Sequence, residues 1–194
     1  MADKIVMDLD DFEDANADKC LARLDDLYTV SHETLKCTLF AIPARTSDHT
    51  FDRVRNRAAY LQLAVHGWDH RWLECEQWGY AATQEVLERC KDNYQHVFKP
   101  PYWKANAEVY RALADASWAV ADHPSNQQAL SPNLRRYVLD EAHRIGMLHR
   151  WQPIVQAHGH VGNDCGNGLE EAFESFLALA KSGKEFAFVT EVLV

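Results

Sequence analysis

Acidic and histidine side chains follow several short apolar runs in this sequence of 194 residues. Asp10 and Asp11 follow the run KIVMDL, and the segment His66–His70 (HGWDH) follows YLQLAV. Two further polar segments, residues 99–103 (KPPYW) and 158–160 (HGH), follow later apolar runs. Because the carboxyl ends of parallel strands meet at one edge of a sheet or barrel, we expect these four segments to converge. Converging carboxylates and imidazoles are the ligands and proton carriers of hydrolytic metal sites.

Each of these segments also has an ordinary structural interpretation. Asp10 and Asp11 are consistent with an acidic helix start that complements the helix dipole. His66 and His70 share one face if a helix begins at Gly67, although such pairs also occur on ordinary surfaces. The two prolines of the KPPYW segment are consistent with a rigid turn, because proline fixes φ. Four such coincidences at neighbouring strand ends are hard to attribute to packing, so together they favour a site.

Strand geometry predicts how the paired residues point. Adjacent residues on an extended strand face opposite sides, so Asp10 and Asp11 are expected to have different roles. His158 and His160 are two residues apart, so both would face the same side if the strand continues. The position directly after the apolar run favours His158 as the reactive histidine.

Composition and charge indicate a globular protein and restrict its partners. Hydrophobic residues make up 47% of the chain and charged residues 25%, which is typical of a domain with a full core. The 29 acidic and 20 basic residues give a formal net charge of −9, which argues against nucleic-acid and anionic-membrane partners. A chain of this length builds a core without a structural metal, so any bound metal is expected to be functional.

The cysteines and the N-terminal residues predict a reducing compartment. The five cysteines form no C-x-x-C pair and are expected to be reduced, mostly buried thiols. The segment MADKIVMDLDD lacks the apolar region of a secretory signal, and no stretch approaches the roughly 18 apolar residues of a membrane span. We therefore expect a cytoplasmic protein. Because no repeat or linker interrupts the chain, residues 1–194 are expected to form a single catalytic domain.

Short apolar runs alternate with amphipathic segments, which predicts βα units around a parallel sheet or barrel. Strands are predicted at residues 4–9, 35–43, 60–65, 97–99, 118–121, 153–157 and 185–189. Helices are predicted at residues 16–30, 48–59, 80–94, 105–115 and 169–182. Residues 123–133 read as a loop, and residues 134–146 as a helix, with a strand at 136–139 as the alternative.

The order of these segments resembles the polysaccharide deacetylase family, the NodB-homology domain of carbohydrate esterase family four, over nearly the whole chain. Residues 9–11 (LDD) are similar to its Thr-Phe-Asp-Asp-Gly segment, and 66–70 (HGWDH) to its His-Ser/Thr-x-x-His element. The FKPPY sequence at residues 98–102 resembles the turn Phe-Arg-Pro-Pro-Tyr-Gly. Residues 37–43 and 154–158 are also similar to strands of the family, and residues 186–193 resemble its closing strand and helix.

The resemblance implies a distorted (β/α) barrel of about seven parallel strands. It implies a metal-dependent hydrolase that removes an acetyl group from an N-acetylated sugar or glycan. On this basis Asp11, His66 and His70 would bind one divalent cation, with Zn²⁺ as the expected ion. Asp10 would be the general base and His158 the general acid.

The resemblance also implies how the substrate is held. The backbone N–H of Tyr102 would bind the developing oxyanion. Lys99, Trp103, Trp68 and His160 are expected to contact the substrate. Lys99 stands where the family has an arginine beside the base, so it keeps the positive charge but loses the bidentate fork.

Several departures leave other functions open. Phe12 stands where the family has glycine, and its Asp-Trp pair is not matched, since Trp118 and Asp122 are poor substitutes. Trp103 stands where the family has another glycine. This change and that of Lys99 in the turn at residues 98–103, together with the unmatched Asp-Trp pair, are consistent with a non-catalytic carbohydrate-binding relative. The two histidines and one carboxylate are also the ligand set of non-haem iron enzymes. Trp118 is expected near the rim of the site, whereas Trp72 is expected in packing.

Overall fold

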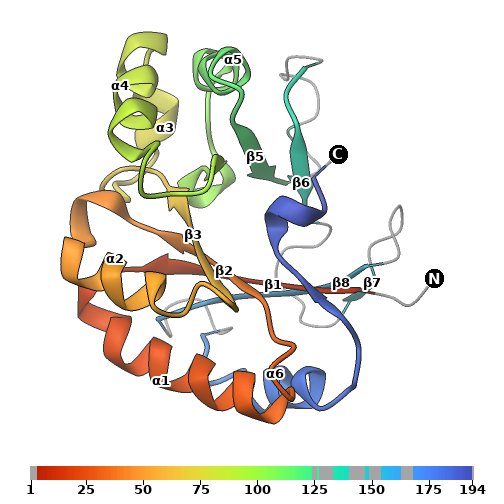
Figure 1. Ribbon diagram of the computed structural model, residues 1–194. Coiled ribbons are helices and arrows are strands. Elements are labelled where there is room, and N and C mark those ends of the chain that lie inside the picture. The colour runs from red at the N-terminus through yellow and green to blue at the C-terminus, as the bar shows by residue number, and fades with distance from the viewer. Residues whose placement is uncertain are drawn as a thin grey trace.

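The structure is one sheet curled around an interior, with helices on its outer side (Figure 1). The computed structural model describes residues 4–123, 126, 133–139, 147–148, 154–162 and 168–193. The strands are β1 (Lys4–Phe12), β2 (Cys37–Ala41), β3 (Leu61–His66), β4 (Val97–Lys99), β5 (Ala119–Asp122), β6 (Arg136–Val138), β7 (Met147–Leu148), β8 (Ile154–His160) and β9 (Phe186–Ala187). The α-helices are α1 (Asp14–Val30), α2 (Asp48–Arg55), α3 (Glu74–Gln77), α4 (Tyr80–Cys90), α5 (Ala107–Asp115) and α6 (Phe173–Ala180).

The strand order confirms the predicted α/β fold, a distorted barrel of parallel strands. The path β6-β5-β4-β3-β2-β1-β8 contains seven strands, and every neighbouring pair in it is parallel. The short strand β7 then pairs antiparallel with β8, and β9 pairs with the first half of β1. The resulting sheet is a half-barrel in which β1 lies between β2 and β8.

Alternate residues of β1 face opposite sides of the sheet. Ile5 and Met7 pack in the core that the helices cover, whereas Val6 belongs to a second cluster inside the half-barrel. Asp8 and Asp10 follow Val6 at intervals of two, so they occupy the same inner face, where both are buried. The interior is thus apolar at the start of β1 and acidic at its carboxyl end.

Neighbouring strands repeat this pattern. Ala64 of β3 and Ile154 of β8 belong to the inner apolar cluster. By the same alternation His66 and His158 face inward further along these strands, where they are 3% and 1% exposed. Lys99, the last residue of β4, is 0% exposed. Regular strand geometry therefore gathers two histidines, one lysine and two carboxylates at one end of the interior.

The helices close the outer face through apolar residues at helical spacing. Helix α1 buries Cys20, Leu24 and Leu27, and each fully buried leucine stabilises the fold by roughly 1.5–3 kcal/mol. Ser47 caps α2 by accepting a hydrogen bond from the backbone N–H of Thr50. These helices hold β1, β2 and β3 in place behind the site.

Several boundaries differ from the prediction. Residues 136–138 form β6 rather than a helix, because pairing with β5 outweighs the local pattern, and residues 140–146 lie outside the described part. Of the predicted loop at residues 123–133, only positions 123, 126 and 133 are described. Strand β1 continues to Phe12 and β8 to His160, so both carry more of the polar residues than expected. Helix α6 begins at Phe173, later than predicted, and neither α3 nor β7 was predicted.

The four described cysteines agree with the prediction of buried, reduced thiols: Cys20, Cys37, Cys75 and Cys90. Burial raises the pKa of the Cys20 thiol. Cys165 lies outside the described residues. Within the described ranges, no helix combines the length and the apolar character needed to cross a membrane.

Candidate active site

The two neighbouring carboxylates at the end of β1 reach the same site because the strand contains a bulge. Between Leu9 and Phe12, β1 contains one more residue than the segment of β2 with which it pairs, and Asp11 has a φ of 64°. Asp10 Oδ2 and Asp11 Oδ1 consequently lie 3.9 and 3.4 Å from Nε2 of His66. The prediction that these adjacent carboxylates face opposite sides is therefore wrong.

Asp11, His66 and His70 form one cluster of potential metal ligands, all within 4.8 Å of one another. Oδ1 of Asp11 lies 3.1 Å from Nε2 of His70, yet among the described residues this buried oxygen has no hydrogen bond of acceptable geometry. Nδ1 of His66 lies 2.9 Å from the carbonyl oxygen of Lys99. A proton on Nδ1 leaves the Nε2 lone pair facing the cluster. One carboxylate and two imidazoles arranged in this way fit a divalent cation such as Zn²⁺.

The electrostatics of this cluster favour positive charge. Burial alone would raise the pKa of Asp11, but the nearby His66 and His70 outweigh it and hold that pKa well below its usual range. Burial alone would lower the pKa of His66, but the negative charges of Asp10 and Asp11 outweigh it and raise that pKa. The same field that stabilises protonated imidazoles stabilises a cation.

A loop after β3, rather than a helix from Gly67, brings His70 to His66. Gly67 and His70 have φ values of 65° and 56°, in the left-handed region that disfavours helix propagation. A Cβ at Gly67 would lie 2.0 Å from Oε1 of Glu74, so only glycine fits there. The nearest helix, α3, begins only at Glu74.

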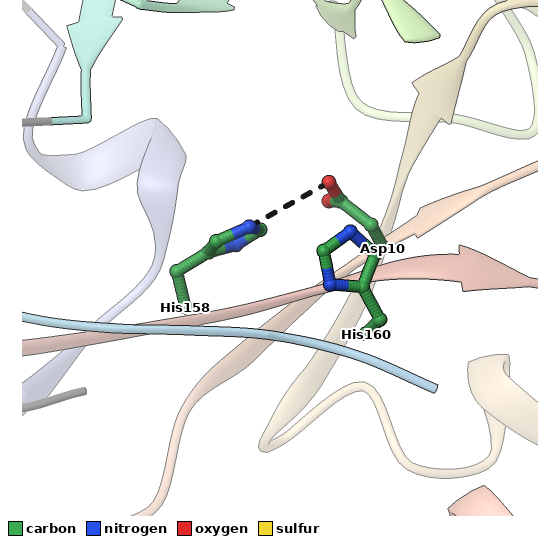
Figure 2. Close-up of side chains that lie close together, drawn as sticks. All are labelled: Asp10, His158 and His160. Atoms are coloured by element: carbon green, nitrogen blue, oxygen red, sulfur yellow. Dashed lines mark ion pairs between the residues drawn. The ribbon is translucent and has the colours of Figure 1, made fainter. Parts of the chain in front are cut away.

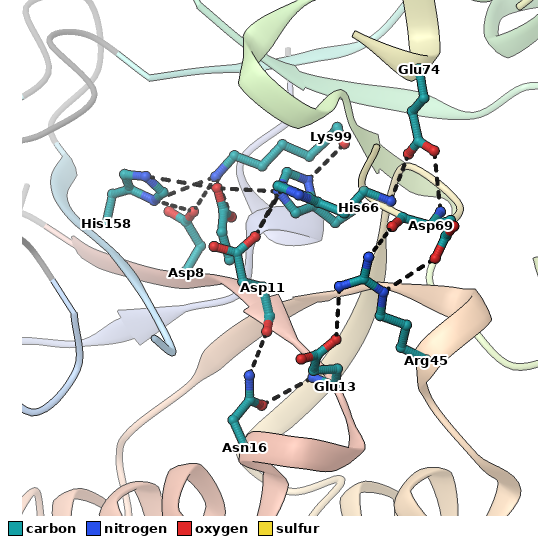
Figure 3. A network of polar contacts seen from close by, with 12 residues as sticks. Asp8, Asp11, Glu13, Asn16, Arg45, His66, Asp69, Glu74, Lys99 and His158 are labelled. Carbon is teal, nitrogen blue, oxygen red and sulfur yellow. Dashed lines mark hydrogen bonds and ion pairs between the residues drawn. The ribbon is translucent and has the colours of Figure 1, made fainter. Parts of the chain in front are cut away.

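Glu74 shapes this loop and was not identified from the sequence. Its carboxylate accepts hydrogen bonds from the backbone N–H groups of Trp68, Asp69 and His70, at 2.8, 3.2 and 3.1 Å (Figure 3). The residue is 7% exposed, so these charge-assisted bonds are shielded from water. No periodic signal marks a carboxylate that binds the backbone of its own preceding loop.

Two further side chains hold the residues around the end of β1, and one of them, Arg45, also binds the loop. Arg45 donates to the Asp69 carboxylate at 3.2 Å and to the Asp69 carbonyl at 2.6 Å, and its other nitrogen lies 3.4 Å from the Glu13 carboxylate. Asn16 donates to the carbonyl oxygen of Asp11 at 2.7 Å. Figure 3 shows both residues beneath the cluster. They fix the distance between the segments that carry the potential ligands.

A second group of charged residues lies beside this cluster in the half-barrel. The ammonium group of Lys99 donates to Asp8 at 2.8 Å and to Asp10 at 2.7 Å. Oδ2 of Asp8 also lies 2.8 Å from Nδ1 of His158. Burial alone would raise the pKa of Asp8, but Lys99 and His158 outweigh it and lower that pKa to about 2. Lys99 therefore contacts carboxylates inside the fold, which differs from the expected contact with substrate.

Asp8 is the carboxylate partner of His158 and was not identified from the sequence. The signal was present, because Asp8 precedes Asp10 by two residues on one strand and so shares its face. The other acidic residue considered, Asp122, contacts Arg136 at 3.4 Å instead.

The aromatic residues divide between two places. Trp103 lies with its ring centroid 5.8 Å from that of His158, and Tyr102 lies 5.1 Å from His70. Both have a φ of 58° within the short turn Pro101–Trp103. Trp118 stacks on the ring of His96, near the beginnings of β4 and β5, so the expectation that it borders the site is wrong.

A cleft of about 620 Å³ lies beside the His66–His70 loop. Its lining includes three indole and two guanidinium side chains, those of Trp68, Trp72, Trp78, Arg71 and Arg89. Trp72 is 68% exposed, so the expectation that it serves in packing is wrong. Its ring centroid lies 4.7 Å from that of Tyr102. The expected substrate-contacting Trp68 thus belongs to this cleft, and Tyr102 connects the cleft to the site.

No protein-family model matches the chain, and no curated protein matches it in sequence. Solved structures match it with low identity. A CE4 family pseudoenzyme from Bacillus anthracis has a TM-score of 0.64 and 12% identity over 98% of this chain. The peptidoglycan deacetylase PdaC from Bacillus subtilis has a TM-score of 0.62 and 16% identity, over 98% of this chain and 89% of that one. The putative polysaccharide deacetylase from Mycobacterium smegmatis gives 0.62 and 14%, over 98% and 88%.

The chain has the polysaccharide deacetylase fold. The fold implied by the sequence resemblance is thus confirmed. The chain spans 65% of the Bacillus anthracis pseudoenzyme, which is less than two thirds of that length. Because this fold occurs in a pseudoenzyme as well as in deacetylases, the fold does not decide activity.

Proposed function

We propose that this chain is a metal-dependent hydrolase that removes the acetyl group from an N-acetylated sugar or glycan. The position of Asp10 carries the proposal. Its Oδ2 lies 3.9 Å from Nε2 of His66, in the cluster that fits a cation, and 3.9 Å from Nε2 of His158. A base between a cation site and a histidine is the arrangement that acyl transfer to water requires.

Asp11, His66 and His70 would hold the cation, with Zn²⁺ as the expected ion. Bound there, a divalent cation supplies a Lewis acid for the acetyl carbonyl and for a water molecule. The unsatisfied Oδ1 of Asp11 supports this assignment, because a buried acceptor without a donor favours a positive ligand.

Asp10 takes the proton of the attacking water. Its Oδ1 accepts a hydrogen bond from Lys99 at 2.7 Å, which holds the carboxylate in one orientation and leaves Oδ2 toward the reacting groups. Lys99 is a positioning residue in this mechanism. The backbone N–H of Tyr102 holds the oxyanion, and Trp103 and His160 form the wall around the acetyl group.

His158 protonates the leaving amine. Asp8 accepts a hydrogen bond from Nδ1, which orients the ring with Nε2 toward Asp10. Nε2 is buried and has no hydrogen-bond partner among the described residues, so it is available to deliver a proton. A non-haem iron enzyme would use the same two histidines and carboxylate, but it needs no such acid and base. The pair of Asp10 and His158 therefore favours hydrolysis.

The aromatic cleft supports a glycan as the substrate. Trp72 and Tyr102 expose ring surface beside His70, and sugars pack their apolar faces on aromatic rings. Arg71 and Arg89 add hydrogen-bond donors to the cleft. A polymer could extend from the acetyl group into this cleft.

Acetate release from N-acetylglucosamine oligomers by the Zn²⁺-loaded protein tests the proposal. We expect His70→Ala to lose both bound metal and acetate release. His49→Ala is the matched control, since His49 is exposed on α2, and it should retain both. A protein loaded with one equivalent of Zn²⁺ that binds these oligomers but releases no acetate would contradict the proposal and favour a non-catalytic carbohydrate-binding protein.

A further inference from the structure

Asp10, His158 and His160 form a second cluster of potential metal ligands. One ligand atom from each lies within 4.8 Å of the others. Figure 2 shows the rings of both histidines near the Asp10 carboxylate. Because β8 remains extended through His160, residues two apart on it face the same side. Asp10 and His160 are also direct neighbours in the pairing of β1 with β8.

The environment of His158 resembles that of a metal-bound histidine. Nδ1 lies 2.8 Å from the Asp8 carboxylate, and Nε2 is buried without a hydrogen-bond partner among the described residues. Lys99 also lies 3.4 Å from Nδ1, but the closer carboxylate requires Nδ1 to carry the proton. A neutral ring in this state directs the Nε2 lone pair at Asp10, and carboxylates commonly support metal-bound histidines through the other nitrogen.

We propose that Asp10, His158 and His160 form a second divalent-cation site, and that its occupation inhibits the enzyme. The Nε2 lone pair of His158 binds either a proton or a cation. A cation there removes the proton donor and engages the carboxylate of Asp10, which is the proposed base. The inhibitory part rests on the proposed function, whereas the binding part does not.

The charges nearby predict that the second site is the weaker one. The carboxylates of Asp8, Asp10 and Asp11 outnumber the single ammonium of Lys99, leaving two net negative charges. One divalent cation in the first cluster neutralises them. No net negative charge would then remain to attract a second cation. The ammonium group of Lys99 also donates to Asp10, the carboxylate that would bind this second cation. We therefore expect filling of the second site only at excess metal.

The ligand types restrict the cation. Two imidazoles and one carboxylate suit Zn²⁺, Co²⁺, Ni²⁺ and Cu²⁺, whereas Mg²⁺ and Ca²⁺ prefer oxygen ligands. Inhibition should accordingly follow excess Zn²⁺ and not excess Mg²⁺.

Calorimetric titration of the metal-free protein with ZnCl₂ tests the binding. Wild-type protein should bind two equivalents, one tighter than the other. His160→Ala and the more conservative His160→Gln should each lose the weaker equivalent and keep the tighter one, which also shows that the variant is folded. His70→Ala should lose the tighter equivalent, and His49→Ala should bind two. Anomalous diffraction from Zn²⁺-soaked crystals should place the second ion at Asp10 and His158.

A single equivalent at saturating Zn²⁺ in the wild type would overturn the inference, as would two equivalents in both His160 variants. Acetate release at increasing Zn²⁺ tests the inhibition separately from the binding. Acetate release should rise up to one equivalent of Zn²⁺ and fall as the second binds. Binding of two equivalents with no acetate release at any Zn²⁺ ratio, one equivalent included, would contradict the proposed function alone, whereas release that persists with both equivalents bound would overturn the inhibition.

Discussion

The two halves of the candidate site are built in different ways. In the proton-transfer half, Asp8, Asp10 and His158 lie on regular strands, and Asp8 pairs directly with His158 in the register of β1 with β8. In the metal-binding half, which comprises Asp11, His66 and His70, two of the three residues have left-handed backbones. The first half follows from strand geometry alone, while the second depends on a bulge and a loop.

Because of this difference, each half is sensitive to different substitutions. Left-handed non-glycine residues cost on the order of 1–3 kcal/mol each and persist only where neighbours hold them. Glu74, Arg45 and Asn16 provide that support for the metal-binding half. The proton-transfer half instead depends on the buried ammonium group of Lys99, which neutralises the carboxylates of Asp8 and Asp10. Substitutions in one half should change metal affinity, and those in the other should change chemistry or stability.

Replacing the two adjacent carboxylates separately should produce the largest contrast. Asp10→Asn should keep the tighter metal equivalent and lower turnover by roughly two to four orders of magnitude, because only the base is removed. Asp11→Asn should lose the metal as well. Elemental analysis and acetate release on both variants make the comparison. Equal metal loss from the first cluster in both would mean that the roles of Asp10 and Asp11 are misassigned.

Removing the buried ammonium should mainly affect stability. Lys99→Met leaves the carboxylates of Asp8 and Asp10 without their cation in the interior, which should lower the free energy of unfolding by about 3–5 kcal/mol. Urea unfolding measures the change. Lys91→Met is the matched control, because Lys91 pairs with Glu88 on the surface, where ion pairs contribute little. A loss in Lys99→Met no larger than in the control would argue against the neutralising role.

The two histidines of β8 should differ in their selectivity for the leaving group. His158→Ala should slow amide hydrolysis by about a hundredfold or more but an activated aryl acetate far less, because the amine requires protonation and the phenolate does not. His160→Ala should affect both substrates similarly and modestly. The ratio of amide to ester rates in each variant is the measurement. A larger amide-selective loss in His160→Ala would place the acid two residues later.

The smallest expected effect concerns the loop of the metal-binding half. Glu74→Gln weakens the three hydrogen bonds to the loop backbone and should lower affinity at the tighter metal site by about 10–100-fold, with a smaller loss of stability than Lys99→Met. Competition with a chromogenic chelator measures this affinity. Glu76→Gln, an exposed change on the same short helix, serves as the control. Unchanged affinity in Glu74→Gln would show that the loop holds His70 without this carboxylate.

The proton-transfer half could be predicted from sequence periodicity. Asp10 and His158 follow apolar strands, and the same alternation applied two residues earlier would have found Asp8. His160 shares the face of His158 because β8 continues, as the spacing of two residues indicated. In a regular strand side chains alternate between the two faces, so the spacing of residues in the sequence predicts which side chains share a face.

The backbone of the metal-binding half could not be predicted in this way. The resemblance to a known family indicated Asp11, His66 and His70 as ligands, and the structure brings them together. The bulge at Asp11 and the loop at His70 depend on contacts from Asn16 and Glu74, which leave no periodic trace. At β6 the preferred helix was wrong and the alternative strand at residues 136–139 was correct for a related reason. Three residues are too few for a period to appear, and pairing with a neighbouring strand decides the outcome.

The position of β1 between β2 and β8 has a consequence for the order of folding. Asp8 meets His158 across a sequence separation of 150 residues, and β9, which pairs with Ile5, comes later still. During synthesis on the ribosome, one edge of β1 therefore stays unpaired until β8 and β9 have been made. Pairing between distant segments slows folding, and an unpaired strand edge can associate with other chains. The proton-transfer half can assemble only when that pairing closes, so we expect a nascent chain to acquire its metal-binding half first and its chemistry last.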